Sequence, residues 1–445
     1  MINVHTIGGY NEVGKNMTAV EIDNDIIVFD CGLYLPAVID LQEAEKNPTP
    51  QMLRNCGALP DDSFLLKNKD RVRAFLITHA HLDHIGAIHH IAYKFPKAQI
   101  FTTPFSLEVL RALMKDSKQN LKNRLVAVHP NSSCFIKGRN KSYKADFINM
   151  THSTIQSSII ALHTNEGIIV YANDYKLDDS PIIGEPPNYQ KMKELAKQGI
   201  KVLIIDCLYS GDERKTHSEK IARAMVEEAL LTVDHGNGAI VISTFSSHIA
   251  RLKSIVEYSK KLNRQVVFMG RSLAKYVNAA KNVNQFSFGK NIQIYNYAKQ
   301  IKSRLNEIDK NRRNYVLVCT GHQGEPGSIL DRLVHNQLPF TFRPGDSVLF
   351  SSRVIPTPVN ISHRANMDKK LKQKDVRIFD NIHVSGHGGR EDLREMIKLL
   401  KPKHIIPSHG GFDKTTPAME LAKEMGYQYG KTAHLCQNDG VVRIT

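Results

Sequence analysis

Six residues in the first fifth of the chain constrain the fold more than any other feature. The segment His79–His84 reads H-x-H-x-D-H and places three imidazoles and one carboxylate within six positions. It follows the apolar run Val72–Thr78, which predicts a buried strand, and precedes Ile85–Tyr93, which predicts a helix. Such a cluster at the end of a buried strand is costly unless its polar groups are bound. The segment therefore predicts a metal site, with a solvated His-rich loop as the alternative.

The spacing within this segment leaves room for two ions. Alternate residues of an extended turn point the same way, so His79 and His81 can bind one ion together. Asp83 and His84 lie where the helix would begin and can serve a second ion beside the first. Zinc takes His nitrogen and Asp oxygen readily, and Mn²⁺ or Mg²⁺ are the alternatives. The six cysteines are scattered and form no C-x-x-C pair, so neither a thiolate zinc site nor a disulfide scaffold is expected.

Length and composition indicate a globular chain of two or three domains. At 445 residues the chain is too long for one ordinary core, and 41% of its residues are hydrophobic against 23% charged. No apolar run approaches the roughly 18 residues that a membrane span needs. The segment Met1–His5 lacks the basic and apolar regions of a secretory signal. We therefore expect a cytoplasmic protein with no membrane partner.

Strand-like and helical patterns alternate along most of the chain, which predicts α/β layers with helices outside a sheet. The opening strands are expected at Val4–Gly9, Met17–Ile22 and Asp25–Asp30. A proline-containing excursion, Leu35–Lys69, is expected to hold at most one helix. Later strands are expected at Ile168–Ala172, Val202–Ile205, Ala239–Ser243, Val266–Met269, Tyr315–Cys319, Ser347–Ser351 and Ile405–Pro407.

Positive charge is concentrated in two stretches of the sequence. Arg111–Lys144 holds nine Lys and Arg against one acid, and Arg251–Arg313 holds fifteen against three. These stretches carry +8 and +12, more than the whole formal surplus of +16. Concentrated basic regions favour a polyanionic partner. Ordinary solvated faces that keep the protein soluble are the alternative, and charge alone does not decide between them.

The H-x-H-x-D-H segment resembles the signature of the metallo-β-lactamase fold, an αββα sandwich. In that family the remaining ligands come from later turns at the same sheet edge, and His152, Asp174 and His409 stand at the matching positions. The resemblance implies two Zn²⁺ per subunit. It assigns one ion to His79, His81 and His152, the other to Asp83, His84 and His409, and makes Asp174 the bridge. It also makes Asp30, at the end of an early strand, the residue that orients ligands from behind.

The middle of the chain resembles the β-CASP domain that metallo-β-lactamase nucleases carry as an insertion. Asp206, His387 and His409 match the three motifs of that subgroup. The expected domains are a metallo-β-lactamase part at 1–208, an α/β β-CASP domain at 209–372, and a second metallo-β-lactamase part at 373–445. The catalytic residues would be His387, Asp206 and Asp83. His387, oriented by Asp206, would protonate the leaving 3′-oxygen as a general acid.

Finer motifs resemble the ribonuclease J family over essentially the whole chain. They are Thr244–His248, Gly270–Ser272, Thr320–Pro326, Ser351–Pro356 and His383–His387. The sequence ends shortly after His409, which resembles the short, archaeal-type branch. His248 and His322 depart from the family's usual Asn and Ser.

This resemblance implies a 5′→3′ exoribonuclease that prefers 5′-monophosphate ends, acts in RNA decay and maturation, takes single-stranded RNA and forms a homodimer. The 5′-phosphate pocket would consist of Ser246, Ser247, His248, His383, Ser385, Gly386 and His387. Small or polar turns before helices at Ile249–Leu262, Ser328–Leu333 and Glu391–Leu400 agree, since helix N-termini offer free amides to phosphate. Ordinary helix capping explains each turn equally well.

Three other functions stay open at this point. The nearest is an endoribonuclease resembling the cleavage-and-polyadenylation nuclease, which shares the metal site but not the Gly321–Pro326 motif. A small-molecule metallo-hydrolase, such as a thioesterase or lactamase, could use the same ions, although the basic insertion argues against it. A catalytically inactive RNA-binding scaffold is the third, and retention of all seven ligands argues against that.

Overall fold

The computed structural model describes residues 1–44, 49–284, 288–289, 292–355 and 358–444. The chain divides into two compact units: Met1–Thr216 with Ser385–Thr445, and His217–Val384. The first unit is discontinuous in sequence, as expected for a fold that carries an insertion. Among the described helices, none has both the length and the apolar character required to cross a bilayer.

The first unit contains two mixed sheets. The first sheet has the order β19-β1-β2-β3-β4-β5-β6. Its strands are β1 (Ile2–Gly8), β2 (Met17–Ile22), β3 (Asp25–Phe29), β4 (Val72–Ile77), β5 (Gln99–Thr102), β6 (Leu125–Ala127) and β19 (Gly440–Ile444). The second sheet has the order β18-β11-β10-β9-β8-β7. Its strands are β7 (Ser132–Lys137), β8 (Ser142–Asn149), β9 (Ser158–Thr164), β10 (Gly167–Ala172), β11 (Ile200–Asp206) and β18 (His404–Ser408).

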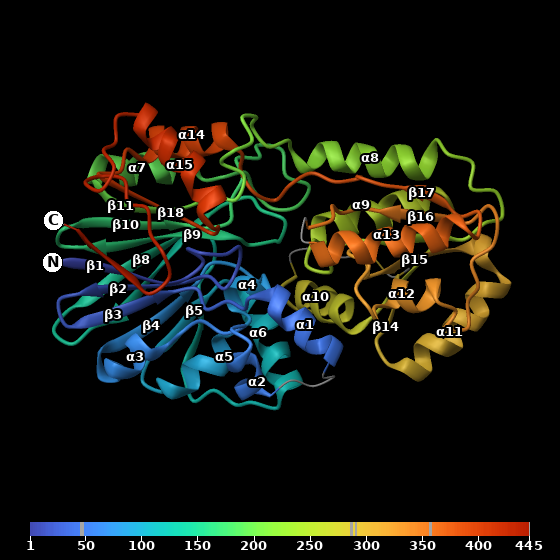
Figure 1. Cartoon of the computed structure of the whole chain (residues 1–445), viewed down its shortest axis with the longest axis horizontal. Coiled ribbons are helices and arrows are strands. Elements are labelled where there is room, and N and C mark those ends of the chain that lie inside the picture. Colours follow the sequence, from blue (N-terminus) through green and yellow to red (C-terminus); the bar gives the residue numbers. More distant parts are fainter. Residues whose placement is uncertain (45–48, 285–287, 290–291, 356–357, 445) are drawn as a thin grey trace. The chain divides into compact units, whose positions relative to one another are not determined.

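The two sheets pack face to face and helices cover their outer faces, so the expected αββα sandwich is confirmed (Figure 1). The shared core takes side chains from both sheets, and the rings of Phe29 and Tyr171 stack with centroids 5.0 Å apart. Each large apolar side chain buried there contributes about 1.5–3 kcal/mol. The second sheet's outer face is covered by α7 (Tyr189–Gln198), α14 (Arg390–Leu400) and α15 (Phe412–Glu424). On the first sheet's outer side lie α5 (Ile88–Ile91) and α6 (Pro104–Ser117).

Two local predictions were wrong. The excursion Leu35–Lys69 was expected to hold at most one helix, but it contains α1 (Leu35–Ala44), α2 (Pro50–Asn55) and α3 (Ser63–Lys67). Thr49 caps α2 and Pro50 is its first residue, both of which favour a helix start. The helix itself is too short to show a periodic pattern of apolar residues. Residues 45–48 of this excursion lie outside the described residues. The single helix expected at Ile85–Tyr93 is instead split among α4 (Leu82–Ile85), α5 and a 3₁₀ turn, η2 (Ala92–Lys94).

The second unit is a parallel sheet of six strands with helices on both faces. Its order is β14-β13-β15-β12-β16-β17, and every neighbouring pair is parallel. The strands are β12 (Ile240–Ser243), β13 (Gln265–Met269), β14 (Ile292–Tyr295), β15 (Tyr315–Cys319), β16 (Ser347–Phe350) and β17 (Arg377–Phe379). The helices are α8 (Glu219–Leu231), α9 (Ile249–Lys261), α10 (Arg271–Asn282), α11 (Ala298–Lys310), α12 (Ile329–Val334) and α13 (Pro358–Lys372).

This sheet brings several sequence motifs to one edge. Parallel strands all end at the same edge, and ligands of open α/β sheets bind outside those ends where the strand order reverses. The turn after β12 carries Ser246–His248, and the turn after the adjacent β15 carries Gly321–Gly327. The inserted unit therefore has the α/β architecture expected from the sequence.

Candidate metal centre

The predicted ligands converge at one edge of the sandwich because each follows the end of a strand. His79 and His81 follow β4, His152 follows β8, Asp174 follows β10 and His409 follows β18. Strands from both sheets thus end around one point, although the ligands are separated by up to 330 positions in the chain. All seven predicted ligands lie in the first unit and are buried or half-buried.

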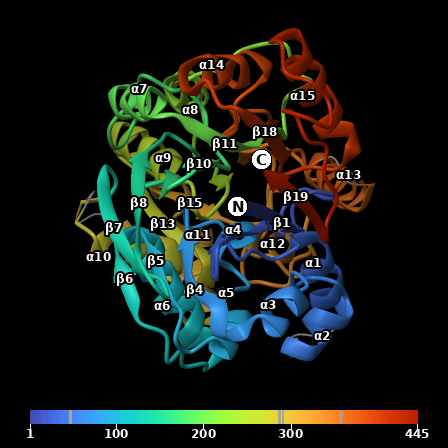
Figure 2. The same ribbon diagram turned by 90° about the vertical axis from the view of Figure 1, so that its left-hand side faces the viewer.

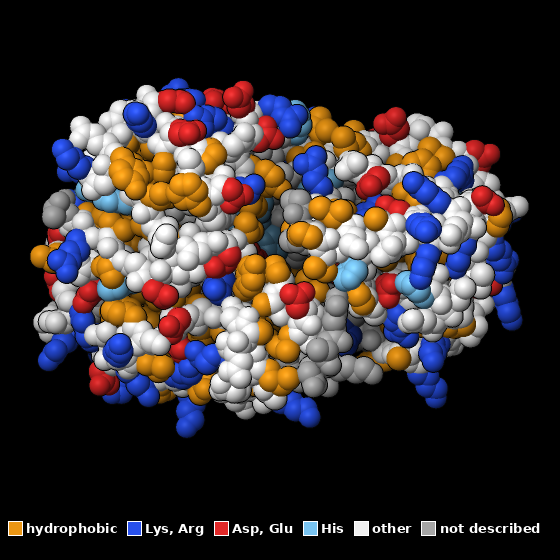
Figure 3. Space-filling model, in the orientation of Figure 1, with side chains coloured by type: hydrophobic (Ala, Val, Ile, Leu, Met, Phe, Trp, Pro, Cys, Tyr) orange, Lys and Arg blue, Asp and Glu red, His pale blue; other side chains and the backbone are white. Residues whose placement is uncertain are grey.

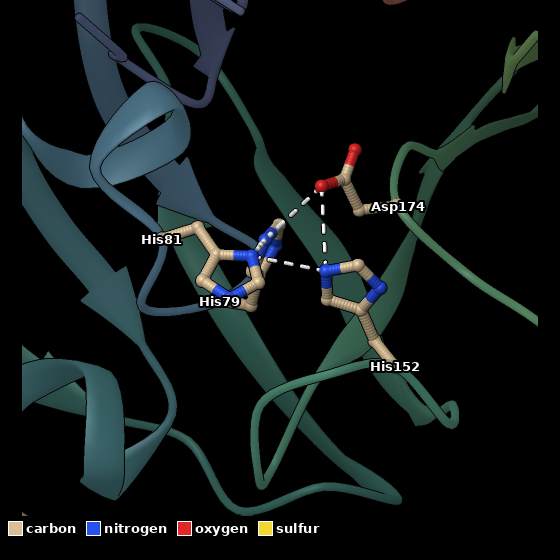
Figure 4. Close-up of side chains that lie close together, drawn as sticks. All are labelled: His79, His81, His152 and Asp174. Atoms are coloured by element: carbon tan, nitrogen blue, oxygen red, sulfur yellow. Dashed lines mark hydrogen bonds and ion pairs between the residues drawn. The ribbon is translucent and has the colours of Figure 1, made fainter. Parts of the chain in front are cut away.

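The first cluster consists of His79, His81, His152 and Asp174, whose potential ligand atoms all lie within 4.8 Å of one another. Figure 4 shows the three imidazoles facing a common centre, with the Asp174 carboxylate above them. His81 Nδ1 lies 3.1 Å from His79 Nε2 and 3.0 Å from His152 Nε2. Three ring nitrogens that face each other this closely present the geometry of a cation site.

The second cluster consists of Asp83, His84, His409 and again Asp174, within the same limit of 4.8 Å. Asp174 Oδ2 lies 3.1 Å from His84 Nε2 and 3.4 Å from His79 Nε2, so one oxygen contacts both clusters. Asp174 Oδ1 is buried, accepts no hydrogen bond, and lies 3.3 Å from His409 Nδ1. The two clusters share Asp174, as a bridging carboxylate requires.

Burial and neighbouring charges tune these groups for metal binding. Burial lowers the pKa of His79, and burial together with His79 holds the pKa of His81 well below its usual value. Burial and His81 do the same to the pKa of His152. Burial alone would raise the pKa of Asp174, but the surrounding histidines outweigh it and hold that pKa well below its usual range. The first cluster thus combines neutral imidazoles with an ionised carboxylate, the protonation states that a divalent cation needs. In the second cluster burial alone would lower the pKa of His84, but Asp174, Asp83 and Asp30 outweigh it and hold that pKa well above its usual value.

Three site residues have left-handed backbone conformations, which non-glycine residues rarely adopt. The φ angles are +56° at Asp30, +56° at Asp174 and +63° at His409. Asp30 and His409 directly follow β3 and β18, and Asp174 lies two residues after the end of β10, so all three lie where the chain turns at the sheet edge. Conformations of this kind cost of order 1–3 kcal/mol each and cluster at functional sites.

Asp30 lies behind the ligands, as the resemblance implies. It is fully buried, and its Oδ2 lies 2.7 Å from His84 Nδ1. Its Oδ1 accepts hydrogen bonds from the backbone N–H of Thr78 at 2.8 Å and from the Thr78 hydroxyl at 3.0 Å. The same hydroxyl lies 2.9 Å from His79 Nδ1. Asp30 and Thr78 therefore fix the rings of two histidines with their Nε2 atoms directed at the cluster.

Asn16 is a site residue that the sequence analysis missed. Its side chain is fully buried, and its Nδ2 lies 2.8 Å from His409 Nδ1 and 3.0 Å from His84 Nε2. Its Oδ1 accepts a hydrogen bond from Asn173 at 3.0 Å. One amide in the turn before β2 thus contacts ligands from two distant turns. An asparagine in a Gly-containing turn carries no periodic signal that could have identified it.

His152 is positioned by a segment that returns from the inserted unit. Its Nδ1 donates to the carbonyl oxygen of Gly386 at 2.7 Å. A Cβ placed on Gly386 would lie 2.7 Å from the Ser153 hydroxyl and 3.0 Å from His152 Cε1. Only glycine fits there without displacing the imidazole, so the backbone of the Ser385–His387 turn is tied to the first cluster.

His387 and Asp206 form the acid–histidine pair expected from the sequence. His387 Nδ1 lies 2.7 Å from Asp206 Oδ2, and its Nε2 faces the cluster, 3.9 Å from Asp174 Oδ2. Burial alone would lower the pKa of His387, but Asp174 and Asp206 outweigh it and raise that pKa to about 9. The side chain is therefore placed beside the clusters with one nitrogen held and the other directed inward. Asp83, the third predicted catalytic residue, lies within the second cluster.

The donor set fits divalent cations. Five His nitrogens and two carboxylates, arranged as two groups around a shared oxygen, suit zinc and are also compatible with Mn²⁺. Asp174 Oδ1 is buried without a hydrogen bond, and the imidazole nitrogens approach one another closely, as groups that share a cation do. The clusters fit a metal-binding site.

The predicted phosphate-binding residues fall into two groups. Ser246, Ser247, His248 and His383 belong to the second unit, whereas Ser385, Gly386 and His387 belong to the first. The helix starts near them are already capped by the chain. The side chain of His248 accepts the backbone N–H of Arg251, Ser328 Oγ accepts that of Asp331, and Asp392 accepts that of Gly389. Ordinary capping accounts for these turns.

Part of the second basic stretch lies inside the protein. Arg251 is fully buried and binds Glu219 with two hydrogen bonds of 2.7 and 2.9 Å. It also donates to the carbonyls of Ser351 and Ile382. Arg312 is buried too and binds Asp346 at 2.7 Å. On the face shown in Figure 3, the exposed Lys and Arg side chains are interspersed with Asp and Glu.

Comparisons with known proteins agree with this geometry. Residues 10–177 match the metallo-beta-lactamase superfamily. Residues 237–367 match the ribonuclease J beta-CASP domain, and residues 375–435 match the Zn-dependent metallo-hydrolase RNA specificity domain. The fold and the site thus define a hydrolase of the metallo-β-lactamase class with an inserted β-CASP domain.

Similar proteins place the chain in one family within this class. Ribonuclease J of Pyrococcus abyssi is 39% identical over 446 residues, covering 100% of this chain and 97% of that protein. Ribonuclease J of Methanocaldococcus jannaschii is 37% identical over 98% of this chain and 97% of its own length. Ribonuclease J 1 of Streptococcus pyogenes is 30% identical and is covered over 74% of its length. The chain belongs to the ribonuclease J family, in its archaeal-type form, and is a metal-dependent nuclease of the class that acts on RNA.

A solved structure supports the fold alone. A crystal structure of a protein of unknown function from Enterococcus faecalis V583 covers 99% of both chains with a TM-score of 0.65 at 17% sequence identity.

Proposed function

We propose that this protein is a 5′→3′ exoribonuclease that prefers 5′-monophosphate RNA ends and uses two Zn²⁺ per subunit. The observation that carries the proposal is the contact between the Gly386 carbonyl and His152, because it fixes the Ser385–His387 turn against the first cluster. A phosphate held at that turn would lie beside the scissile bond. The distance between anchor and cleavage site sets the length of the product, so an adjacent anchor favours release of single nucleotides from the 5′ end.

The Ser385–His387 turn has groups suited to a phosphate. The backbone N–H of His387 donates to the Ser385 hydroxyl at 3.0 Å, which leaves that hydroxyl's own proton to donate. The absence of a side chain on Gly386 lets the backbone of this turn lie directly against Ser153 and His152. Ser246, Ser247, His248 and His383 of the inserted unit stay a prediction as further contributors to the pocket.

The mechanism follows from the placement of His387. When bound, two divalent cations lower the pKa of a water molecule and neutralise charge that develops on the phosphate. His79, His81 and His152 would hold one cation, and Asp83, His84 and His409 the other, with Asp174 shared. His387 Nε2 carries the proton for the leaving 3′-oxygen, while Asp206 holds Nδ1 and fixes the ring. Positioned general acids of this kind contribute about 10²–10⁴-fold to rate.

The test is a time course on three forms of one RNA labelled at its 3′ end. We expect the 5′-monophosphorylated form to disappear stepwise with release of mononucleotides. The 5′-triphosphorylated form should decay more slowly because its extra phosphates need room, and the circular form should resist. Equal rates on all three forms, with discrete fragments, would show internal cutting and overturn the exonuclease proposal.

We also propose that the enzyme acts in the cytoplasm, in RNA decay and maturation, and as a homodimer. All six cysteines lie in the described part of the chain and are free, which agrees with a reducing compartment. Light scattering on the protein as it elutes from a size-exclusion column would give a mass near 100 kDa for a dimer of the 50.2 kDa chain. A mass of one chain over the micromolar range would contradict the dimer.

A further inference from the structure

A basic groove lies in the first unit, away from the metal centre. It has a volume of about 760 Å³ and is formed where β6, the edge strand of the first sheet, lies beside β7, the edge strand of the second. Figure 2 shows β4, β5, β6 and β7 together on one side of this unit. The groove contacts Val72 and Arg73 at the start of β4, whereas the metal ligands follow its end. At about 3.3 Å per residue, Arg73 and His79 are roughly 20 Å apart along the strand.

The charge of this groove is one-sided. Five cationic side chains line it and no acidic one does: Arg73, Lys97, Lys122, Arg124 and Lys137. Arg73 is ion-paired with Asp25, which lies outside the lining. The other four are exposed, and within the described residues none of them forms an ion pair. Four uncompensated cations around one depression attract a polyanion.

An exposed aromatic ring lies in the same groove. Phe135 is 67% exposed, an unusual position for a large apolar side chain. Along β7 the side chains of Cys134 and Ile136 are buried, while those of Phe135 and Lys137 face outward. The alternation therefore presents a ring and a cation side by side, two residues apart on an edge strand. Exposed rings between cations are the features on which unpaired bases stack while phosphates are bound.

We propose that this groove binds a segment of single-stranded RNA, with phosphates on Lys97, Lys122, Arg124 and Lys137 and a base stacked on Phe135. It is a second RNA-binding site, separate from the metal centre, that holds the body of a long substrate while its end is hydrolysed. The proposal rests on RNA as the substrate and not on the polarity of cleavage. A double helix hides its base faces, so the exposed ring favours a single strand.

The test measures binding separately from hydrolysis. The probe is a 20-nucleotide oligouridylate with phosphorothioate linkages and a dye that blocks its 5′ end, added to the metal-loaded full chain. The variants are Lys122→Glu with Arg124→Glu, and Phe135→Ala. A matched control, Lys193→Glu with Lys197→Glu on α7, makes the same charge change at exposed positions outside the groove. Fluorescence anisotropy is recorded between 50 and 200 mM salt.

We expect the groove charge reversal to weaken binding about tenfold or more, and the loss of two phosphate contacts to reduce the salt slope by about 1.4. The fourfold rise in salt should then cost this variant about sevenfold less affinity than it costs the parent. Phe135→Ala should weaken the single strand and leave a blunt duplex of matched sequence unchanged. On long RNA the KM should rise and kcat stay constant, whereas pentanucleotide hydrolysis should be unaffected.

Two results would overturn the proposal. A control pair that reduces affinity and salt slope as much as the groove pair would show that bulk charge alone is responsible. Groove variants that bind the probe normally but change the mass of the protein in solution would assign these edge strands to contact with a second copy of the chain. Because the probe has a blocked end and is not cleaved, failure of the exonuclease proposal would leave this measurement unaffected.

Discussion

Replacing Asp206 by Asn tests the catalytic role assigned to His387. The substitution keeps the size of the side chain and an oxygen that can still accept the backbone N–H of Leu208, now 2.8 Å from Asp206 Oδ1. It removes the negative charge that lies 2.7 Å from His387 Nδ1. A hydrogen bond between charged groups is worth about 1.5–3 kcal/mol. Since 1.36 kcal/mol changes a rate tenfold, turnover should fall about 10- to 150-fold.

The assay is single-turnover hydrolysis of 5′-monophosphorylated RNA with enzyme in excess, so that product release does not limit the rate. Metal content is measured on the same samples, because Asp206, His387 and Asp174 are close enough together to hold a cation themselves. We expect the metal content to stay constant. His387→Ala is made alone and together with Asp206→Asn, which completes a double-mutant cycle.

The cycle discriminates between positioning and an independent role. If Asp206 acts through His387, the double variant should be no slower than His387→Ala alone. Fully additive losses, or a fall in turnover that follows a fall in bound metal, would refute the assignment of Asp206 as the residue that orients the general acid.

Three further substitutions have defined outcomes. Gly386→Ala should lower turnover by up to about 10²-fold with the fold retained, because the new Cβ would displace the His152 ring by contact at 3.0 Å. Asn16→Ala should weaken metal affinity about 10–100-fold in a competition with a chelator, because its amide contacts two ligands. Glu219→Gln should lower the free energy of unfolding at pH 7 by about 3 kcal/mol, because it leaves the Arg251 charge buried without its counter-charge. Burial alone would raise the pKa of Glu219, but His248 and Arg251 hold it well below its usual range. Its stabilisation is therefore present above the unfolded value of about 4.3 and lost as pH falls below it, so the variant should show a flatter acid limb of Tm against pH.

Two of these substitutions have a matched control, and each has a result that would contradict it. In Gly211→Ala the new Cβ would lie 3.7 Å from a Pro417 carbon, an ordinary van der Waals contact, so turnover should stay unchanged. An equal loss of turnover in this variant would contradict the steric explanation for Gly386→Ala. Normal metal retention in Asn16→Ala would show that the amide is dispensable. The exposed Glu228→Gln on the same helix should leave unfolding unchanged, and an equal effect there would contradict the buried-pair account of Glu219.

The part of the site that the sequence could predict is the part that is local. His79, His81, Asp83 and His84 lie within one turn after one strand, so their spacing alone carries the chemistry. His152, Asp174 and His409 could be predicted only through family resemblance, since each is a single polar residue after a strand. Neither local spacing nor family resemblance identified Asn16, because its partners lie 68 and 393 positions away and its turn has no periodic pattern.

The fold shows the same division between local and distant information. The apolar runs predicted β4, β10, β11, β18 and four strands of the inserted unit, β12, β13, β15 and β16, because strands buried on both faces read as continuous hydrophobic segments. The strands β8 and β9, the edge strands β14 and β17 of the inserted unit, and the C-terminal β19 were not predicted. The residues Gly440–Ile444 form a strand because they pair with Ile2–Thr6 at the other end of the chain, and no property of the segment alone reveals that partner. The basic stretch Arg251–Arg313 was interpreted from its charge alone, but Arg251 and Arg312 within it are buried and paired, and composition cannot distinguish a solvated cation from a buried one.

We propose that hydrolysis requires two ions held by the clusters that share Asp174, and titration of metal-free protein tests this most directly. The full chain is stripped with a chelator, zinc is returned in steps, and bound metal and RNA hydrolysis are measured in each sample. We predict that each chain binds two equivalents of zinc and that activity reaches its maximum with the second. In Asp174→Ala we expect fewer than two equivalents to bind and hydrolysis to be lost. Full hydrolysis by metal-free protein, or unchanged metal binding and turnover in Asp174→Ala, would contradict the account.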